Sequence, residues 1–161
     1  MDQKFYEQDC VTVAKALVGK LLVCNGKRLR ISETEAYWGE TDTACHAHKG
    51  RTNRTEVMYA EGGTIYIYLC YGMHWMLNIV TGKKEDPQAV LIRACIDAEG
   101  PGKLTKALGI TGELNRNHIL KQDSLRIEDD GFRCDIEADK RGGIGYASKE
   151  DQDRLWRFKG I

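Results

Sequence analysis

The sequence contains no long apolar run and little that breaks regular secondary structure. Only two of its 161 residues are proline, and no stretch approaches the roughly 20 apolar residues that a membrane-spanning helix requires. Residues 1–9 also lack the basic start and the apolar stretch of a secretory signal. These absences predict a cytoplasmic protein without a membrane partner.

The sequence also has no excess of charge of either sign. Its 24 Lys and Arg residues balance 24 Asp and Glu residues, so the overall charge offers no attraction for a polyanion. Any contact with nucleic acid must then come from local basic clusters, each of which also suits an ordinary solvated loop. The clusters are Lys49 with Arg51 and Arg54, Lys83 with Lys84, Lys103 with Lys106, and Lys140 with Arg141.

Closely spaced cysteine pairs are absent as well. The six cysteines include no CxxC pair, and several lie within apolar stretches where a small hydrophobic side chain packs well. We therefore expect reduced core residues at positions 10, 24, 45, 70, 95 and 134.

The sequence does contain a series of short strand patterns. Two β-hairpins are predicted. One turns at Asn25-Gly26, because these residues accept the positive φ of a type I′ turn, and the other covers Thr64–Val80 with an aromatic tip at Tyr71. A further strand covers Val90–Ile96, and shorter strands follow Leu125.

Helix signals are fewer and short. Asp9 can cap an amphipathic helix that Gly19 closes, Pro101 can open a helix that ends at Leu108, and Ser148 can cap a third. At 161 residues the chain has the size of one compact domain. We therefore predict an α+β fold in a single domain over residues 1–161.

The strand predicted over Leu29–Tyr37 carries two carboxylates at the end of an apolar face. Strict alternation places five residues on this face: Leu29, Ile31, Glu33, Glu35 and Tyr37. A carboxylate in this position is partly desolvated, which raises its basicity and suits it to take a proton from water. The alternative is that the strand leaves the core there and that both glutamates are solvated.

Arg93 stands between Ile92 and Ala94 in an otherwise apolar strand. An unpaired guanidinium would be costly to bury there, so Arg93 needs an acidic partner. Glu35 is a candidate for this partner. A purely structural ion pair would satisfy the same requirement.

Two tyrosines and a pair of histidines could line a binding site. Tyr66 and Tyr68 share one strand face and could stack a planar base, although such pairs more often pack within a core. Cys45, His46 and His48 could bind a metal together with a nearby carboxylate, but a His-x-His pair without a third conventional ligand in register is a weak signal. His46 could equally hydrogen-bond a ligand or the backbone.

Several motifs follow one another along almost the whole chain. They are Glu33-Thr-Glu35-Ala-Tyr37, His46, Arg51-Thr-Asn-Arg54 with Met58, Gly63 to His74, Asn78, Val90-Leu-Ile-Arg93-Ala, Gly100-Pro-Gly-Lys-Leu104, Gly143-Ile-Gly-Tyr146 and Trp156-Arg-Phe158. In content and in order, these motifs resemble the alkyladenine (3-methyladenine) DNA glycosylase family.

The resemblance implies a mixed α/β fold around a curved antiparallel sheet, with a protruding hairpin that intercalates into DNA and without a metal, an iron–sulfur cluster or another cofactor. It implies a monomeric, monofunctional DNA glycosylase of base excision repair, associated with the nucleoid if the source is prokaryotic. The implied substrates are 3-methyladenine, 7-methylguanine, hypoxanthine and ethenoadenine in double-stranded DNA. The implied product is an abasic site.

The resemblance also implies which residues perform the reaction. Glu35 would be the general base, and Arg93 would help to hold the attacking water beside it. Tyr37 and His46 would line one side of the flipped base, and Tyr68 would stack on the other side.

Two further roles follow from the same resemblance. Tyr71, at the hairpin tip, would fill the gap that the flipped nucleotide leaves in the duplex. Asn78 would lie on the pocket floor and clash with the 2-amino group of guanine. Trp75-Met76 stand where relatives usually carry a smaller aromatic residue and cysteine, and relatives vary at Trp38. The shape of the pocket and the range of substrates are therefore the properties that the resemblance implies least directly.

Water, and not an amine, is expected to attack the sugar, because no lysine falls at the implied catalytic positions. Two alternatives stay open. A protein that binds damaged or distorted DNA without catalysis would have no need of Glu35 with Arg93. A metal-dependent hydrolase would use Cys45, His46, His48 and a glutamate.

Overall fold

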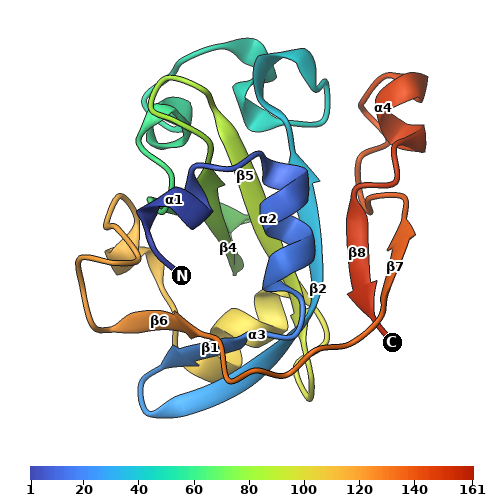
Figure 1. Cartoon of the computed structure of the whole chain (residues 1–161). Helices are drawn as coiled ribbons and strands as arrows, with labels where there is room; N and C mark the ends of the chain where they lie inside the picture. The colour runs from blue at the N-terminus through green and yellow to red at the C-terminus, as the bar shows by residue number, and fades with distance from the viewer.

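A curled antiparallel sheet of eight strands organises the computed structural model, which describes residues 1–161 (Figure 1). Hydrogen-bonded neighbours follow the order β3-β4-β5-β2-β1-β6, and β8 pairs with both β2 and β7. The strands are β1 (Leu21–Cys24), β2 (Lys27–Tyr37), β3 (Ile65–Cys70), β4 (His74–Thr81), β5 (Gln88–Cys95), β6 (Leu125–Glu128), β7 (Ile136–Asp139) and β8 (Arg157–Gly160).

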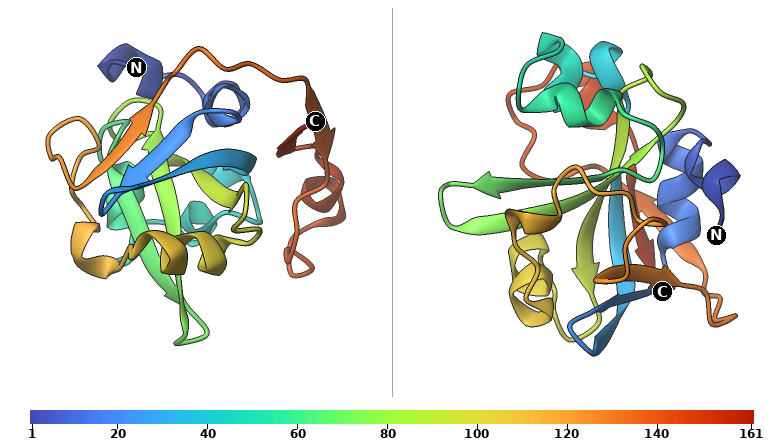
Figure 2. Two further views of the ribbon diagram at one scale, coloured as in Figure 1. Left: turned by 90° about the horizontal axis from the view of Figure 1, so that it is seen from below. Right: turned by 90° about the vertical axis from the view of Figure 1, so that its left-hand side faces the viewer.

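Short helices and 3₁₀ turns cover the two faces of this sheet. Figure 2 shows α3 and the turns η1–η3 on opposite sides of the protruding β3–β4 hairpin. None of the helices is long and apolar enough to span a membrane. The helices are α1 (Gln3–Tyr6), α2 (Cys10–Leu17), α3 (Pro101–Leu108) and α4 (Lys149–Asp153), and the turns are η1 (Gly39–Thr41), η2 (His46–Lys49), η3 (Thr55–Tyr59) and η4 (Gly112–Leu114).

The two faces of the sheet enclose different clusters of side chains. α2 and α3 pack on one face, where Ile65 and Ile67 of β3 join the main hydrophobic core. On the other face, Tyr66 and Tyr68 meet a smaller cluster formed with η2 and η3. The alternation predicted for β3 is therefore confirmed, and it turns its two tyrosines away from the main core.

The predicted hairpins and helix starts are confirmed, but α2 ends at Leu17 with Val18 as its C-cap, so the expectation that Gly19 closes it is wrong. Asn25 and Gly26 have φ values of 52° and 75°, as a type I′ turn requires. The side chain of Asp9 accepts a hydrogen bond from the first turn of α2, α3 begins at Pro101, and Ser148 caps α4 in the same way. A curved antiparallel sheet with few short helices is the α+β fold that the sequence predicts.

The strict alternation predicted for β2 is wrong. Thr34 pairs with Ile92 and Glu33 pairs with Ala94, which leaves Arg93 as an extra residue on β5. Next, Ile31 pairs with Cys95, which leaves Ser32 as an extra residue on β2. Each extra residue is a β-bulge, and a bulge changes the face to which the following side chains point.

The bulge at Ser32 places Ile31 and Glu35 on different faces of β2. Ile31 and Ala36 belong to the main core, and the Thr34 hydroxyl donates to the Ala14 carbonyl of α2. Glu35 and Tyr37 point to the opposite face, where their side chains are hydrogen-bonded to each other. Ile31 and Glu35 therefore lie on different faces of the sheet, whereas residues four positions apart in a regular strand lie on the same face.

All six cysteines are unpaired in the structure, and four of them are buried. The core positions predicted for Cys10, Cys24, Cys45 and Cys95 are confirmed. Cys70 and Cys134 are only half-buried, because each lies at the end or outside of a strand.

Candidate active site

A cavity of about 440 Å³ opens on the face of the sheet that carries the smaller cluster. Side chains from β2, β3, β4 and β5 form its walls together with the segment 142–146. Six of the seven residues to which the resemblance assigns a role line it: Tyr37, His46, Tyr68, Tyr71, Asn78 and Arg93. The fold therefore gathers residues that lie more than 50 positions apart in the chain.

Glu35 lies directly beneath this cavity and has no solvent-exposed surface. Its Oε1 accepts a hydrogen bond from the Tyr37 hydroxyl at 3.2 Å and lies 3.4 Å from Nη1 of Arg93. Its Oε2 accepts a 2.7 Å hydrogen bond from the backbone N–H of Gly142. The acidic partner expected for Arg93 is thus Glu35, and the solvated alternative for Glu35 is wrong.

Burial controls the proton affinity of Glu35. Desolvation raises the pKa of the Glu35 carboxyl above its ordinary value, and the charge of Arg93 and the hydrogen bonds from Gly142 and Tyr37 offset part of this rise. A carboxylate with a raised pKa accepts a proton more readily than a solvated one. The site therefore holds a buried base next to a cation.

Glu33 has a different environment, although it is only two residues away. Its carboxylate forms ion pairs with Arg157 at 2.9 Å and Lys159 at 3.6 Å, both on β8. Neither carboxylate lines the cavity itself, but Glu35 contacts three residues that do, Tyr37, Arg93 and Gly142. Of the two carboxylates singled out from the sequence, only Glu35 belongs to the site.

Aromatic rings form one wall of the cavity. The ring of His46 lies 4.6 Å from that of Tyr68 in an edge-to-face arrangement, and Tyr66 lies 5.4 Å from Tyr68. Aromatic pairs in contact have centroids about 4.5–7 Å apart, so a base between His46 and Tyr68 would need nearly twice their separation. The rings of His46 and Tyr68 are therefore in direct contact in this structure, and a base stacked between them would have to move them apart.

His46 is neutral in this wall at ordinary pH. Burial, together with the charge of Arg54, lowers the pKa of the His46 imidazole to about 4. Its Nδ1 lies 2.9 Å from the Tyr66 hydroxyl, which fixes the orientation of the ring. Arg54 also lies over the Tyr68 ring, 4.9 Å from its centroid. One arginine of the predicted basic clusters therefore belongs to the cavity itself.

Asn78 is buried in the cavity wall, and its amide is held by the backbone. Its Nδ2 lies 3.3 Å from the carbonyl oxygen of Tyr66 and 3.4 Å from that of Met76, and it donates to both. The neighbouring strand and the backbone of β4 thus orient this side chain before any ligand binds.

Tyr71 occupies the tip of the β3–β4 hairpin at the rim of the cavity. Its side chain is 92% exposed, and its backbone has a φ of 52°. A large aromatic side chain with almost no contact to its own protein is available for a partner.

An ion pair that sequence reasoning missed lies below the cavity. Arg141 was grouped with Lys140 as a surface cluster, but its side chain has 0% exposure and binds Asp42, which has 1%. Lys140 is exposed and pairs with Asp153. The neighbouring Gly142-Gly143 turn was the only local signal, and it could not reveal a partner 99 positions away.

The three candidate metal ligands do not converge in the structure. His46 is bound to Tyr66, and Nδ1 of His48 lies 2.7 Å from the backbone oxygen of Glu40. The Cys45 side chain packs in the smaller cluster. No three His, Cys, Asp or Glu side chains form a group that could hold a metal ion.

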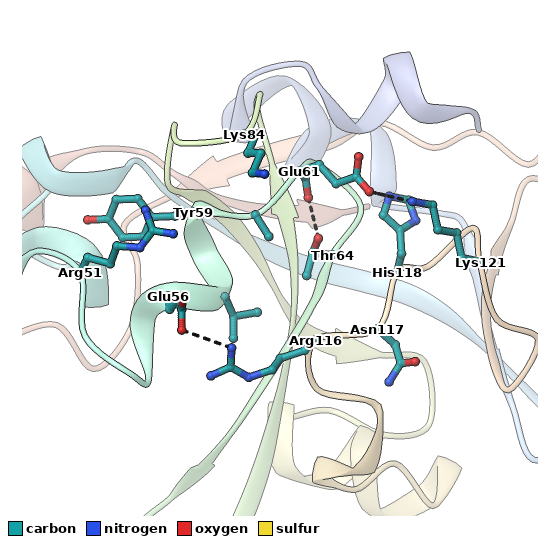
Figure 3. A pocket seen from close by; sticks show the side chains of 12 residues that line it. Arg51, Glu56, Tyr59, Glu61, Thr64, Lys84, Arg116, Asn117, His118 and Lys121 are labelled. Atoms are coloured by element: carbon teal, nitrogen blue, oxygen red, sulfur yellow. Dashed lines mark hydrogen bonds and ion pairs between the residues drawn. The ribbon is translucent and has the colours of Figure 1, made fainter.

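A second, larger cavity of about 700 Å³ lies at the edge of the sheet formed by β3 (Figure 3). Its charged side chains are exposed and mostly paired: Arg116 with Glu56, and Lys121 with Glu61. His118 is buried, and its ring contacts the Gly62 carbonyl. This cavity holds no buried carboxylate.

Comparison with known proteins agrees with this geometry. The family model described as methylpurine-DNA glycosylase (MPG) matches residues 4–98 and 96–160. The protein is accordingly a DNA glycosylase, a hydrolase that cleaves the N-glycosidic bond between a base and its deoxyribose.

Relatives match the whole chain. A protein of Borreliella afzelii named for 3-methyladenine DNA glycosylase activity is 46% identical over 98% of this chain and 94% of its own length. Proteins with the same name from Natranaerobius thermophilus and Rickettsia rickettsii are 42% and 38% identical, again over 98% of this chain and over 93% and 88% of their own lengths. The chain belongs to the methylpurine-DNA glycosylase family.

Proposed function

We propose that this enzyme removes 3-methyladenine and related damaged purines from double-stranded DNA with a water molecule that Glu35 activates. The related substrates are 7-methylguanine, hypoxanthine and ethenoadenine. The observation that carries the proposal is the fully buried Glu35 carboxylate beneath an aromatic cavity, in contact with Arg93. The names of the relatives support 3-methyladenine as the principal substrate.

The chemistry follows from the environment of Glu35. Water attacks C1′ of the deoxyribose, the bond to the base breaks, and its electron pair leaves with the base. Glu35 accepts the proton of the water, and its charge stabilises the cationic sugar that develops. Arg93 opposes the desolvation of Glu35 and directs the water. A cationic alkylated purine leaves as a neutral molecule, so it needs no acid, whereas hypoxanthine and ethenoadenine leave with an extra electron pair and must take up a proton from solvent water.

The cavity suits a planar base that has left the helix. Its volume of about 440 Å³ falls within the range of about 300–1,000 Å³ that is typical of ligand pockets. We place the base between Tyr37 and His46 on one side and Tyr68 on the other, so a bound base would separate the rings of His46 and Tyr68. Asn78, held by two backbone carbonyls, faces the base and disfavours the 2-amino group of guanine, a penalty that cationic 7-methylguanine offsets because it is a much better leaving group.

Tyr71 is the residue that we propose to enter the duplex. Extrusion of a nucleotide costs a few kcal/mol, and an inserted aromatic side chain recovers part of this free energy. The exposure of Tyr71 beside the cavity mouth supports this role. A damaged purine that stacks or pairs poorly costs less to extrude.

Water is the nucleophile in this proposal, because no lysine lines the cavity. A lysine amine would form a covalent intermediate with the sugar and lead to strand cleavage. We therefore expect an abasic site as the product. Borohydride trapping of a protein–DNA adduct would contradict this expectation.

The decisive experiment compares Glu35→Gln with Glu33→Gln on duplexes that carry a single hypoxanthine or 3-methyladenine, with abasic sites detected by alkaline cleavage. We expect Glu35→Gln to lower the single-turnover rate about 100-fold or more, the contribution of a positioned general base. Glu33→Gln changes the neighbouring carboxylate of the same strand, which forms ion pairs outside the cavity, and should keep a rate close to wild type.

Other outcomes would favour the alternatives. A folded wild-type protein that binds lesions but releases no alkylated or deaminated purine would be a binding protein. Activity lost to a chelator and restored by zinc would indicate a metal-dependent hydrolase. Equal rates for Glu35→Gln and wild type would contradict the assignment of Glu35.

A further inference from the structure

The buried ion pair between Arg141 and Asp42 connects the elements that surround Glu35. The two side chains form a bidentate pair, with Nη–Oδ distances of 2.6 and 3.0 Å. Arg141 also donates to the carbonyl oxygens of Ala36 at 2.9 Å and Asp151 at 3.1 Å. One guanidinium thus joins the end of β2 to the loop after it and to α4.

Asp42 completes this connection from the other side. Its Oδ2 accepts a hydrogen bond from the Trp38 backbone N–H at 2.9 Å, and its Oδ1 accepts one from that of Ala44 at 3.1 Å. Ala44 lines the cavity. The pair therefore fixes the chain immediately after Tyr37 as well as part of the cavity wall.

Gly142, the residue next to Arg141, contacts both Glu35 and Arg93. Gly142 donates its N–H to Glu35 Oε2 at 2.7 Å. A Cβ atom at Gly142 would lie only 2.7 Å from Nη2 of Arg93, so its backbone also packs directly against this side chain. The position of this segment thus decides both the hydrogen bonding of Glu35 and the space available to Arg93.

Burial of the Arg141–Asp42 pair has a large desolvation cost. Both side chains are fully desolvated, and the Nε of Arg141 has no hydrogen-bond partner. Buried ion pairs often contribute no more stability than apolar residues of the same volume. Stability alone therefore does not account for it, whereas a group that must hold a backbone donor in place needs directional bonds of this kind.

We propose that Arg141, through its pair with Asp42, is a positioning residue for base excision: it holds the Gly142 N–H on Glu35 and the Tyr37 ring against the cavity. The guanidinium lies 4.9 Å from the centroid of the Tyr37 ring and 5.1 Å from that of the Trp156 ring. This inference rests on the proposed role of Glu35 as the base.

The pH profile separates this role from a purely structural one. The groups that face Glu35 are Tyr37 on β2, Arg93 on β5, Arg157 on β8 and the Gly142 amide. Loss of the amide hydrogen bond removes an interaction that favours the charged form. The pKa of the Glu35 carboxyl then rises, and the acidic limb of the excision rate moves to higher pH.

The test uses a double variant, Arg141→Met with Asp42→Asn, because removal of one partner alone would leave an unpaired buried charge. We expect its single-turnover excision rate at neutral pH to fall at least tenfold. We also expect its acidic limb to move up by about one pH unit, the size of shift that a hydrogen bond to a charged group supports. Affinity for a duplex with an uncleavable abasic analogue should stay within twofold of wild type.

Two further variants keep the outcome decisive. Arg141→Lys keeps the charge but lacks the planar guanidinium, which donates to two carbonyl groups and one carboxylate at once. It should therefore show the same changes more weakly. If the double variant does not fold, Arg141→Lys provides the test. Arg30→Met removes a half-exposed ion pair with Asp130 far from the cavity and should match wild type. A folded variant with the wild-type rate and pH profile would overturn the positioning role.

Failure of this inference can be distinguished from failure of the proposed function. If Glu35→Gln is inactive while the Arg141 variants resemble wild type, only the positioning role is wrong. If Glu35→Gln excises bases at the wild-type rate, the proposed base is wrong and the positioning role falls with it.

Discussion

The site cavity and the larger cavity at the β3 edge differ in where their charges lie. The cavity of about 700 Å³ at the β3 edge is lined by exposed charges, whereas the cavity of about 440 Å³ covers a buried carboxylate and a half-buried arginine. The turn η3 supplies residues to both. Size therefore does not identify the reactive site.

Desolvation makes the difference between these cavities. Exposed ion pairs such as Lys121 with Glu61 are worth about 0–1 kcal/mol, because water screens them. The Lys121 side chain lowers the pKa of the Glu61 carboxyl, so Glu61 stays ionised and is a weak base. Burial has the opposite effect on Glu35. The smaller cavity holds its carboxylate in a state that can take up a proton.

The sharpest test of this contrast is the same substitution in each cavity. Arg93→Met removes the cation that opposes the desolvation of Glu35, and we expect the excision rate to fall about 100-fold, as for other groups that stabilise charge at an active site. Arg116→Met in the larger cavity serves as the control. Similar losses in both variants would show that the contrast between the cavities has no catalytic meaning.

The pH dependence of excision tests the buried state of Glu35. In the proposed mechanism the carboxylate is the active form, and its pKa is raised, so the rate should fall about tenfold per pH unit below that pKa and level off above it. The folded state binds this proton more tightly than the unfolded state. The charge of Glu35 therefore lowers the free energy of unfolding at neutral pH, and this cost disappears as the pH falls through the raised pKa.

Glu35→Gln separates these two effects of the charge. It should abolish the acidic limb of the excision rate while leaving the thermal midpoint of unfolding unchanged or higher. An acidic limb that persists in this variant would assign the titration to another group.

Tyr71→Ala tests the aromatic rim that only the smaller cavity possesses. We expect excision at low enzyme concentration to fall about tenfold, equivalent to about 1.4 kcal/mol, because the inserted side chain no longer offsets the cost of base extrusion. The thermal midpoint should not change, since the side chain is 92% exposed. Tyr71→Phe keeps the ring and should retain most of the activity.

The smallest effect is expected in the larger cavity. Arg116 pairs with Glu56 at 3.6 Å, and both side chains are about half exposed. Arg116→Met should therefore change the free energy of unfolding by no more than about 0.5 kcal/mol, as is usual for surface substitutions. Urea unfolding measures this change. A much larger loss would show that this pair is more than a surface contact.

Local sequence patterns predicted the elements of the fold well. Asn25-Gly26 allows only a few turn types, Asp9 and Ser148 supply oxygen atoms that cap nearby N–H groups, and Pro101 is compatible with the first turn of a helix. Each of these residues acts on the backbone within a few positions, so the local sequence alone determines the turn or the helix start.

The predicted site residues came from two sources. The need of Arg93 for a buried acidic partner is a physical requirement that can be read from its apolar strand, and the structure confirms Glu35 as that partner. The roles of Tyr71 and Asn78 came from the resemblance to the family. The contact between the rings of His46 and Tyr68 could not be predicted, because it depends on how η2 packs against β3.

Tertiary structure alone decided the final geometry of the site. The bulge at Ser32 turns Glu35 away from the face that holds Ile31, and bulges arise from the register between two strands, which neither strand specifies alone. The pair of Arg141 with Asp42 spans 99 positions. By itself the sequence determined which elements form and which charge needs a partner. Cross-strand register and long-range packing then determined which carboxylate is buried and what surrounds it.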